Sequence, residues 1–160
     1  MNIVELDPFD DSQLEKIKKF EEKNECLNKQ SENIMRIRKN ISKEEYYDSN
    51  KNDFEKILII EKNNEITDCC HIYGEKDIKQ CQITLITTDN KKREISQLAT
   101  DYALNNLGME EVFITVSKDD NSMITYLELR GYENIGEVNG KILLLKETYS
   151  LFLLAISPKN

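Results

Sequence analysis

The sequence predicts an α+β fold with a mixed, mostly antiparallel central sheet of about six to seven strands flanked by helices. Two observations carry this prediction. Short runs of β-branched and apolar residues recur through the second half of the chain, and turn dipeptides led by Asn separate some of them. Before and between these runs, apolar residues recur at helical spacing among Lys and Glu, which is typical of amphipathic helices.

The N-terminal part, residues 1–55, is expected to hold one strand and two helices. Residues 2–6 form the strand, and the following Asp-Pro and Asp-Asp pairs end it. Ser12 and Glu15 have the spacing of a capping box at the start of the first helix. The residues on its buried face are Leu14, Ile17, Phe20 and Leu27. A second helix is expected over 31–40, and the polar stretch 43–53 is expected to be a loop with at most one helical turn.

Residues 56–88 read as an antiparallel meander. Its three strands are expected at 57–61, 66–73 and 78–87, with turns at 63–64 and 74–77. If the second turn centres on residues 75 and 76, Cys70 and Cys81 face each other across the strands. A small buried hydrophobe is the ordinary role of such a cysteine, and a disulfide, or a metal shared with His71, is the alternative.

Residues 89–148 predict a helix, a strand, a second helix and a hairpin. The first helix spans 93–108 and ends at a glycine. The strand at 112–116 is apolar throughout, as in a central strand buried on both faces. Asn121 or Ser122 is expected to cap the next helix, and the hairpin joins 133–138 to 141–147 through Asn139 and Gly140. Residues 149–160 form an apolar tail that extends the sheet or pairs with another copy of the chain.

Composition limits the classes of function. A length of 160 residues is typical of one domain, so we expect a single domain over 1–160. The net charge of −8 argues against nucleic acid as a partner, because binding phosphates usually needs a basic surface. There is no signal-peptide pattern, and the longest apolar stretch, 151–156, is too short to span a membrane. We therefore expect a cytoplasmic protein without a membrane partner. The four cysteines lack Cys-x-x-Cys spacing, which predicts reduced thiols and no metal.

The order of elements, from the first strand to the final hairpin, resembles that of the GNAT acyltransferase superfamily. Two local segments strengthen the resemblance. Residues 121–132, from Asn121 to the Gly131-Tyr132 pair, look like the helix with which the family follows its cofactor strand. Residues 112–116 resemble the strand that splays from its neighbour to admit the pantetheine arm of the cofactor.

The resemblance implies acetyl-CoA or another acyl-CoA as co-substrate. Backbone groups at Leu85, Ile86 and Thr87 would then contact the pantetheine, and the start of the following helix, together with Asn121, would lie at the cofactor. The family has a glycine-rich loop there, whereas no glycine lies between Gly74 and Gly108 in this chain. The cations that stand in its place are Lys91, Lys92 and Arg93. They either pair with the CoA phosphates or form an ordinary solvated loop.

The resemblance also implies a tyrosine that protonates the leaving thiolate, as general acid catalysis requires. The family position falls on Leu127, and Tyr126, one residue earlier, is the candidate; its alternative role is packing. His71, the only histidine, is a candidate for the general base. Its alternative role is that of a half-buried polar residue without a part in catalysis. Glu61 and Glu65 flank a turn and are expected to be solvated, so no base is assigned.

The resemblance leaves two functions open. The first is an N-acyltransferase that moves an acetyl or other acyl group from acyl-CoA to an unidentified amine, either a small molecule or a peptide. The second is a catalytically inactive binding or regulatory module that kept the fold and lost the usual CoA-pyrophosphate loop. A homodimer through the C-terminal tail is the partner that the apolar segment suggests.

Overall fold

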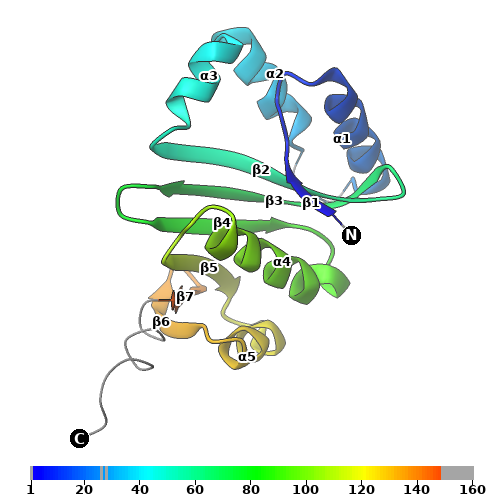
Figure 1. Ribbon diagram of the computed structural model, residues 1–160. Coiled ribbons are helices and arrows are strands. Elements are labelled where there is room, and N and C mark those ends of the chain that lie inside the picture. Colours follow the sequence, from blue (N-terminus) through cyan, green and yellow to red (C-terminus); the bar gives the residue numbers. More distant parts are fainter. Residues whose placement is uncertain (1, 26, 28, 149–160) are drawn as a thin grey trace, which may run out of the picture.

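The computed structural model describes residues 2–25, 27 and 29–148. One sheet organises the described chain, with helices on both of its faces (Figure 1). The strands are β1 (Asn2–Glu5), β2 (Asp53–Lys62), β3 (Glu65–Glu75), β4 (Gln80–Ile86), β5 (Glu111–Ser117), β6 (Glu133–Val138) and β7 (Lys141–Glu147). The helices are α1 (Asp11–Lys23), α2 (Ser31–Asn40), α3 (Lys43–Ser49), α4 (Lys92–Asn105) and α5 (Asn121–Leu129), with a 3-10 turn, η1 (Asp89–Lys91), before α4.

The sheet is mixed and has seven strands in the order β1-β2-β3-β4-β5-β7-β6. Only β4 and β5 run parallel among the strand pairs of the described chain, and every other pair is antiparallel. A parallel pair needs a long crossover connection, which α4 supplies here. This architecture confirms the predicted fold class.

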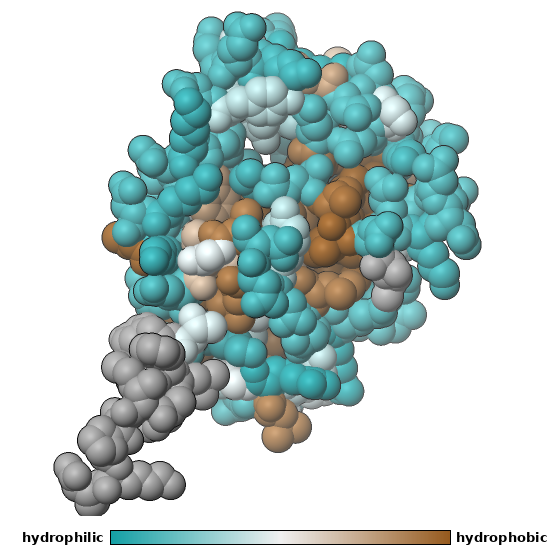
Figure 2. Space-filling model, in the orientation of Figure 1, coloured by the Kyte–Doolittle hydropathy of each residue, from teal (hydrophilic) through white to brown (hydrophobic). Residues whose placement is uncertain are grey.

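Two apolar cores lie on opposite faces of the sheet, because side chains alternate along each strand. On one face α4 and α5 pack against residues such as Leu58, Ile72 and Ile114, each at most 1% exposed. On the other face α1 and α2 cover a smaller core that includes Ile17, Ile34 and Ile59. Figure 2 shows one face of the molecule, which is mostly hydrophilic, with apolar residues visible near its middle.

The first helix begins with a different cap from the predicted one. The Asp10 carboxylate accepts hydrogen bonds from the backbone N–H groups of Ser12 at 2.9 Å and Gln13 at 3.2 Å. Ser12 therefore lies inside α1 and does not cap it. Aspartate is as good an N-cap as serine, and the capping-box spacing alone did not distinguish the two positions.

The prediction of a loop at 43–53 is wrong for the first half of this stretch, which forms α3. Ser42 caps this helix, and its hydroxyl accepts from the N–H of Glu45 at 3.1 Å. Two glutamates, Glu44 and Glu45, lie in the first turn, where the helix dipole favours negative charge. Because the segment is mostly polar, its sequence pattern did not indicate the short helix that lies over the sheet.

The turn between β3 and β4 is later than predicted, and this moves the cysteines. Strand β3 runs to Glu75 and β4 begins at Gln80, so Cys81 pairs with Gly74 and Cys70 pairs with Leu85. The predicted direct facing of Cys70 and Cys81 is therefore wrong. Both thiols are free and buried in the core under α4, in keeping with the role of small hydrophobes.

Strand β5 is buried on one face only, whereas its apolar sequence predicted burial on both. Val112, Ile114 and Val116 face the core under α4, but Thr115 on the other side is exposed. The predicted tail segment and its dimer lie outside the described residues. In the described part of the chain, no helix combines the length and apolar character needed to cross a membrane.

Candidate functional site

The parallel strands β4 and β5 separate part-way along their length. Their pairing begins at Gln80–Glu111 and ends at Ile83–Ile114. Beyond that point β4 continues to pair with β3 as far as Ile86, while β5 continues to pair with β7 as far as Ser117. An opening therefore lies between the C-terminal ends of two parallel strands, which is a common location for ligands in sheets of this type.

The predicted backbone site, Leu85 to Thr87, lies on the β4 side of this opening. Leu85 is half-buried, whereas Ile86 and Thr87 are 5% and 8% exposed. The Thr87 hydroxyl donates a hydrogen bond to the Asp68 carboxylate, which is only 2% exposed. Asp68 thus fixes the end of β4 from the neighbouring strand β3.

The same carboxylate also holds the first of the three predicted cations. Lys91 Nζ lies 3.2 Å from Asp68 Oδ2. Because the other oxygen of Asp68 accepts from Thr87, this buried group connects the end of β4 to the turn before α4. A carboxylate this deep is stabilised when a cation and a hydroxyl share it. The pair positions the loop that replaces the expected glycine-rich segment.

The other two cations also have partners within the chain. Lys92 Nζ lies 2.8 Å from Asp89 Oδ1 and 3.4 Å from Asp120 Oδ2. The hydrogen bond with Asp89 raises the pKa of Lys92, and the same bond lowers the pKa of Asp89. Arg93 donates to the Ser122 hydroxyl, so both residues link the start of α4 to the start of α5.

Helix α5 places Tyr126 beside this cation group. The ring is half-buried and lies between two guanidinium groups, with Arg93 Cζ 5.5 Å and Arg130 Cζ 5.2 Å from its centroid. Asn121 is exposed in the first turn of α5. Neither Asn121 nor Ser122 caps the helix as predicted, because the Asp120 carboxylate accepts from the N–H of Met123 at 3.2 Å.

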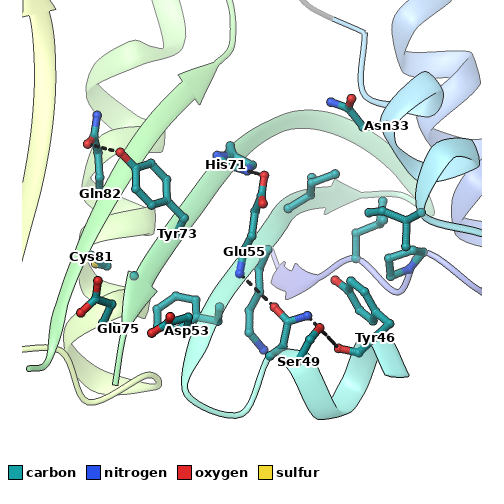
Figure 3. Close-up of a pocket in the computed structure, with 18 of the residues that line it drawn as sticks. Asn33, Tyr46, Ser49, Asp53, Glu55, His71, Tyr73, Glu75, Cys81 and Gln82 are labelled. Atoms are coloured by element: carbon teal, nitrogen blue, oxygen red, sulfur yellow. Dashed lines mark hydrogen bonds and ion pairs between the residues drawn. The ribbon is translucent and has the colours of Figure 1, made fainter. Parts of the chain in front are cut away.

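A cavity of about 960 Å³ opens on the other face of the sheet, between β2 to β5 and the helices α2 and α3 (Figure 3). Its floor is formed by side chains on the outer face of the strands, among them Glu55, His71 and Gln82. Tyr46 and Ser49 of α3 line it from above, together with Asn33 of α2. The part of the chain that was predicted to be a loop therefore forms one wall of this cavity.

The single histidine lies in this cavity and has a carboxylate partner. His71 Nε2 is 2.8 Å from Glu55 Oε1, and Figure 3 shows the Glu55 side chain reaching along β2 to the imidazole on β3. The His71 side chain is 23% exposed, so the ring is accessible from the cavity. A carboxylate on one ring nitrogen orients the imidazole.

The sequence did not reveal this pair for a specific reason. The strand that became β2 was predicted to begin at residue 57, which left Glu55 outside it, whereas β2 begins at Asp53. In the actual register Ile57 faces His71, and Glu55 is its diagonal neighbour. The predicted strands therefore could not place Glu55 beside the imidazole. The two glutamates weighed as a base lie away from the cavity: Glu61 pairs with Lys16 at 3.5 Å and Glu65 with Lys23 at 3.4 Å.

Thr84 lies between the opening at β4 and β5 and His71 of the cavity. This residue is the cross-strand partner of His71 on β4, and it follows Ile83, the last residue of β4 that pairs with β5. Thr84 is exposed, on the same face of the sheet as Gln82 of the cavity floor. Among the described residues, no cluster of three or more His, Cys, Asp or Glu is arranged to hold a metal ion. The arrangement thus offers an acid-base pair beside a split in the sheet.

Comparison with known proteins identifies the fold. No protein-family model and no curated protein matches the sequence. A dodecameric spermidine N-acetyltransferase from Vibrio cholerae aligns with a TM-score of 0.65 at 12% identity, over 98% of this chain and 98% of that one. The N-acetyltransferase PseH from Campylobacter jejuni aligns with a TM-score of 0.62 at 11% identity, over 92% and 97%.

A third structure contains ligands. It is the spermidine N-acetyltransferase from Vibrio cholerae in complex with CoA and spermine, with a TM-score of 0.52 at 13% identity over 68% of this chain and 75% of that one. At these identities the likeness establishes the fold and leaves the chemistry to the residues of this chain. The chain has the fold of the GNAT N-acetyltransferases, as its sequence predicts.

Proposed function

We propose that the chain is an N-acyltransferase that moves an acyl group from acyl-CoA to an amine. The observation that carries this proposal is that His71 of the cavity pairs across the strands with Thr84, the first residue of β4 beyond its pairing with β5. The opening between β4 and β5 reaches the sheet position at which His71 and Glu55 line the cavity. A donor held in the opening and an acceptor held in the cavity would meet there, and such alignment is a large part of catalysis of group transfer.

The residues around the opening fit acyl-CoA as the donor. The end of β4 has no partner on β5, so its backbone is available to the amides of the pantetheine arm. Lys91, Lys92 and Arg93 lie together at the start of α4, where phosphate groups would meet three cations. These cations now pair with carboxylates and a hydroxyl of the chain. Phosphate binding therefore exchanges one set of partners for another and replaces the usual glycine loop.

The proton path follows from the side chains on either side of the sheet. The amine binds in the cavity, and its nitrogen attacks the thioester carbonyl carbon as the bond from that carbon to sulfur breaks. His71 takes the proton that the amine loses, and Glu55 stabilises the imidazolium that forms. Tyr126, whose ring lies beside Arg93 and Arg130, is the candidate for giving a proton to the leaving thiolate.

The solved structures with this fold support an amine acceptor. The relatives described above are named as N-acetyltransferases, and one was solved with CoA and spermine. The competing function is a GNAT-fold module that binds a ligand without transferring an acyl group. The His71–Glu55 pair favours the enzyme, because a binding module does not need a base beside the strand opening.

Calorimetric titration of acetyl-CoA tests the donor half of the proposal. The wild-type protein is expected to bind in the micromolar range, and a variant with Lys91, Lys92 and Arg93 changed to Ala is expected to lose at least tenfold in affinity. A control variant changes three exposed cations of the N-terminal helices to Ala, namely Lys18, Lys19 and Lys39, and should bind like the wild type. Absence of binding heat in the wild type would favour the inactive module.

Steady-state release of CoA tests the catalytic half. His71→Gln is expected to lower kcat by about 10² to 10⁴-fold, the usual range for loss of a general base, with a smaller effect on KM. Glu55→Gln should cause a smaller loss in kcat, because the imidazole loses the carboxylate that orients it. Glu65→Gln, on an exposed glutamate outside the cavity, is the control. An unchanged kcat in His71→Gln would remove this residue from the mechanism.

A further inference from the structure

Two carboxylates lie at the end of the cavity that is distant from the strand opening. Asp53 begins β2 and Glu75 ends β3, and the two are direct cross-strand partners on the face that forms the cavity floor. Figure 3 shows them together at this end, with Glu55 and His71 further along the same strands. Both are exposed, and among the described residues neither has a cationic partner. Like charges placed directly opposite on neighbouring strands are unfavourable, and a cation between them would relieve the repulsion.

Further carboxylates lie near the α3 wall of the cavity. Burial raises the pKa of Tyr46 in the α3 wall to about 12, and the negative charges of Asp7, Glu5 and Glu55 add to this effect. Asp7 and Glu55 thus add negative charge beside this wall of the cavity. This observation is independent of Asp53 and Glu75, which do not contribute to it.

The two cationic residues among those that line the cavity, Lys56 and Arg36, do not contact the carboxylates of the floor. Lys56 lies 3.0 Å from Glu5 and its charge is already paired. Its side chain alternates with Glu55 and Ile57 on β2 and so points to the opposite face of the sheet. Arg36 is exposed on α2 and donates to the Asn33 side chain at 3.2 Å. The floor thus combines three carboxylates with one imidazole.

The spacing of the charged groups sets the length of the ligand. At about 3.3 Å per residue, Glu75 lies roughly 13 Å along β3 from His71, and Asp53 lies roughly 7 Å along β2 from Glu55. Between the two ends the floor carries the Tyr73 ring, which is 44% exposed, and Phe113 adds a second ring. Apolar rings between two negative ends suit a chain of methylene groups that carries a positive charge at each end.

We propose that this cavity selects a diamine or polyamine, with one nitrogen at the His71–Glu55 pair and a second, charged nitrogen at Asp53 and Glu75. The inference rests on the proposed function for its acyl transfer, and it adds the class of acceptor. Asp53 and Glu75 determine specificity without taking part in the reaction, because the charged nitrogen they hold is not the one that is acylated. The nitrogen at His71 loses its proton and receives the acyl group.

Calorimetric titration of amines in the absence of acyl-CoA tests the acceptor class. Putrescine and spermidine are expected to bind at least tenfold more tightly than butylamine, which lacks the second charge. In the double variant Asp53→Asn/Glu75→Gln, the preference for putrescine over butylamine should fall to about twofold. In each single variant, this preference should be intermediate. The control variant Glu128→Gln/Glu133→Gln changes two exposed glutamates outside the cavity lining and should keep the full preference. Equal binding of putrescine and butylamine by the wild type would overturn the inference.

The two proposals fail in different ways. If acetyl-CoA binds and CoA is released with butylamine as readily as with putrescine, the acyltransferase stands and the acceptor class falls. If putrescine binds with the expected charge dependence and acetyl-CoA does not bind, the polyamine site stands and the acyltransferase falls. Thermal denaturation of each variant identifies any that fail to fold, and the single variants then carry the comparison. A KM for putrescine that rises in Asp53→Asn at unchanged kcat would support a role in specificity alone.

Discussion

Replacing Glu21 should loosen the helical wall of the cavity. This residue lies near the end of α1 and is 8% exposed. Its Oε1 accepts from the backbone N–H groups of Gln30 at 2.5 Å and Ser31 at 2.8 Å, and its Oε2 accepts from the Ser31 hydroxyl at 2.6 Å. Gln30 is the N-cap of α2 and makes no capping hydrogen bond of its own. The Glu21 carboxylate therefore supplies, from a neighbouring helix, the acceptor that the first turn of α2 needs.

The magnitude follows from the groups left without a partner. Glu21→Ala leaves two backbone N–H groups without this acceptor, at a cost of about 1 to 2 kcal/mol each, while the Ser31 hydroxyl can turn to water. The expected loss in free energy of unfolding is about 2 to 4 kcal/mol. For a chain of this size that loss lowers the Tm by roughly 4 to 16 °C. Glu21→Gln keeps an acceptor oxygen and should lose about 1 kcal/mol.

Urea denaturation followed by circular dichroism measures these differences. Glu22→Ala, one residue along α1 and exposed, is the control and should remain within about 0.5 kcal/mol of the wild type. Because α2 carries Asn33, Arg36 and Ile37 into the cavity lining, Glu21→Ala should also weaken amine binding under conditions in which the protein is still folded. A Glu21→Ala variant as stable as Glu22→Ala would refute the capping argument.

Three further predictions concern the sheet and the loop before α4. Burial raises the pKa of the Cys69 and Cys81 thiols from 9.0 to about 12, so they stay protonated in the folded chain while they ionise in the unfolded one. The free energy of unfolding should therefore be unchanged below pH 9 and fall as the pH rises from 9 towards 12. Urea denaturation at pH 8 and pH 10 measures this difference, and equal midpoints at the two pH values would contradict the prediction. Gly74→Ala should lower the free energy of unfolding by about 1 to 3 kcal/mol, because the added Cβ would lie 2.3 Å from a backbone oxygen of β4. An unchanged Tm would show that the strands can move apart at no cost in stability. Asp68→Asn should tighten acetyl-CoA binding several-fold by releasing Lys91 from its ion pair, and calorimetry showing equal or weaker binding would count against that loop as the phosphate site.

The sequence predicts the order of elements well where periodicity and turn residues agree. The helix at 31–40 and the final hairpin about Asn139 and Gly140 match the structure residue by residue. Both have strong local signals, namely an apolar stripe at helical spacing and a turn dipeptide that takes positive φ at both residues. Local chemistry alone determines such elements.

The cavity depends on features that the sequence carries weakly. Helix α3 is short and polar, so its pattern resembles a loop, although it forms one wall. The pairing of Asp53 with Glu75 and the approach of Glu55 to His71 depend on strand ends, and the register of a strand is set by its neighbours as well as by its own residues. His71 was therefore considered as a general base from its residue type alone. It was not assigned that role, because the sequence could not place Glu55 beside it.

The cation group illustrates a different limit. Composition and position predict Lys91, Lys92 and Arg93 at the start of α4, and the structure places them there. Their partners Asp68 and Asp120 come from β3 and from the residue before α5, far away in the sequence. Ion pairs of this kind form only when the folded chain brings distant residues together, and no local sequence pattern predicts them.

Direct detection of acyl transfer tests the account most closely. The purified protein is incubated with acetyl-CoA and either putrescine, spermidine or butylamine, and the amines are analysed by mass spectrometry beside protein-free and His71→Gln samples. We expect acetylated putrescine and spermidine well above the protein-free level, much less acetylated butylamine, and a loss of about 10² to 10⁴-fold in His71→Gln. Acetylated amine no higher than in the protein-free sample, for all three amines, would contradict it.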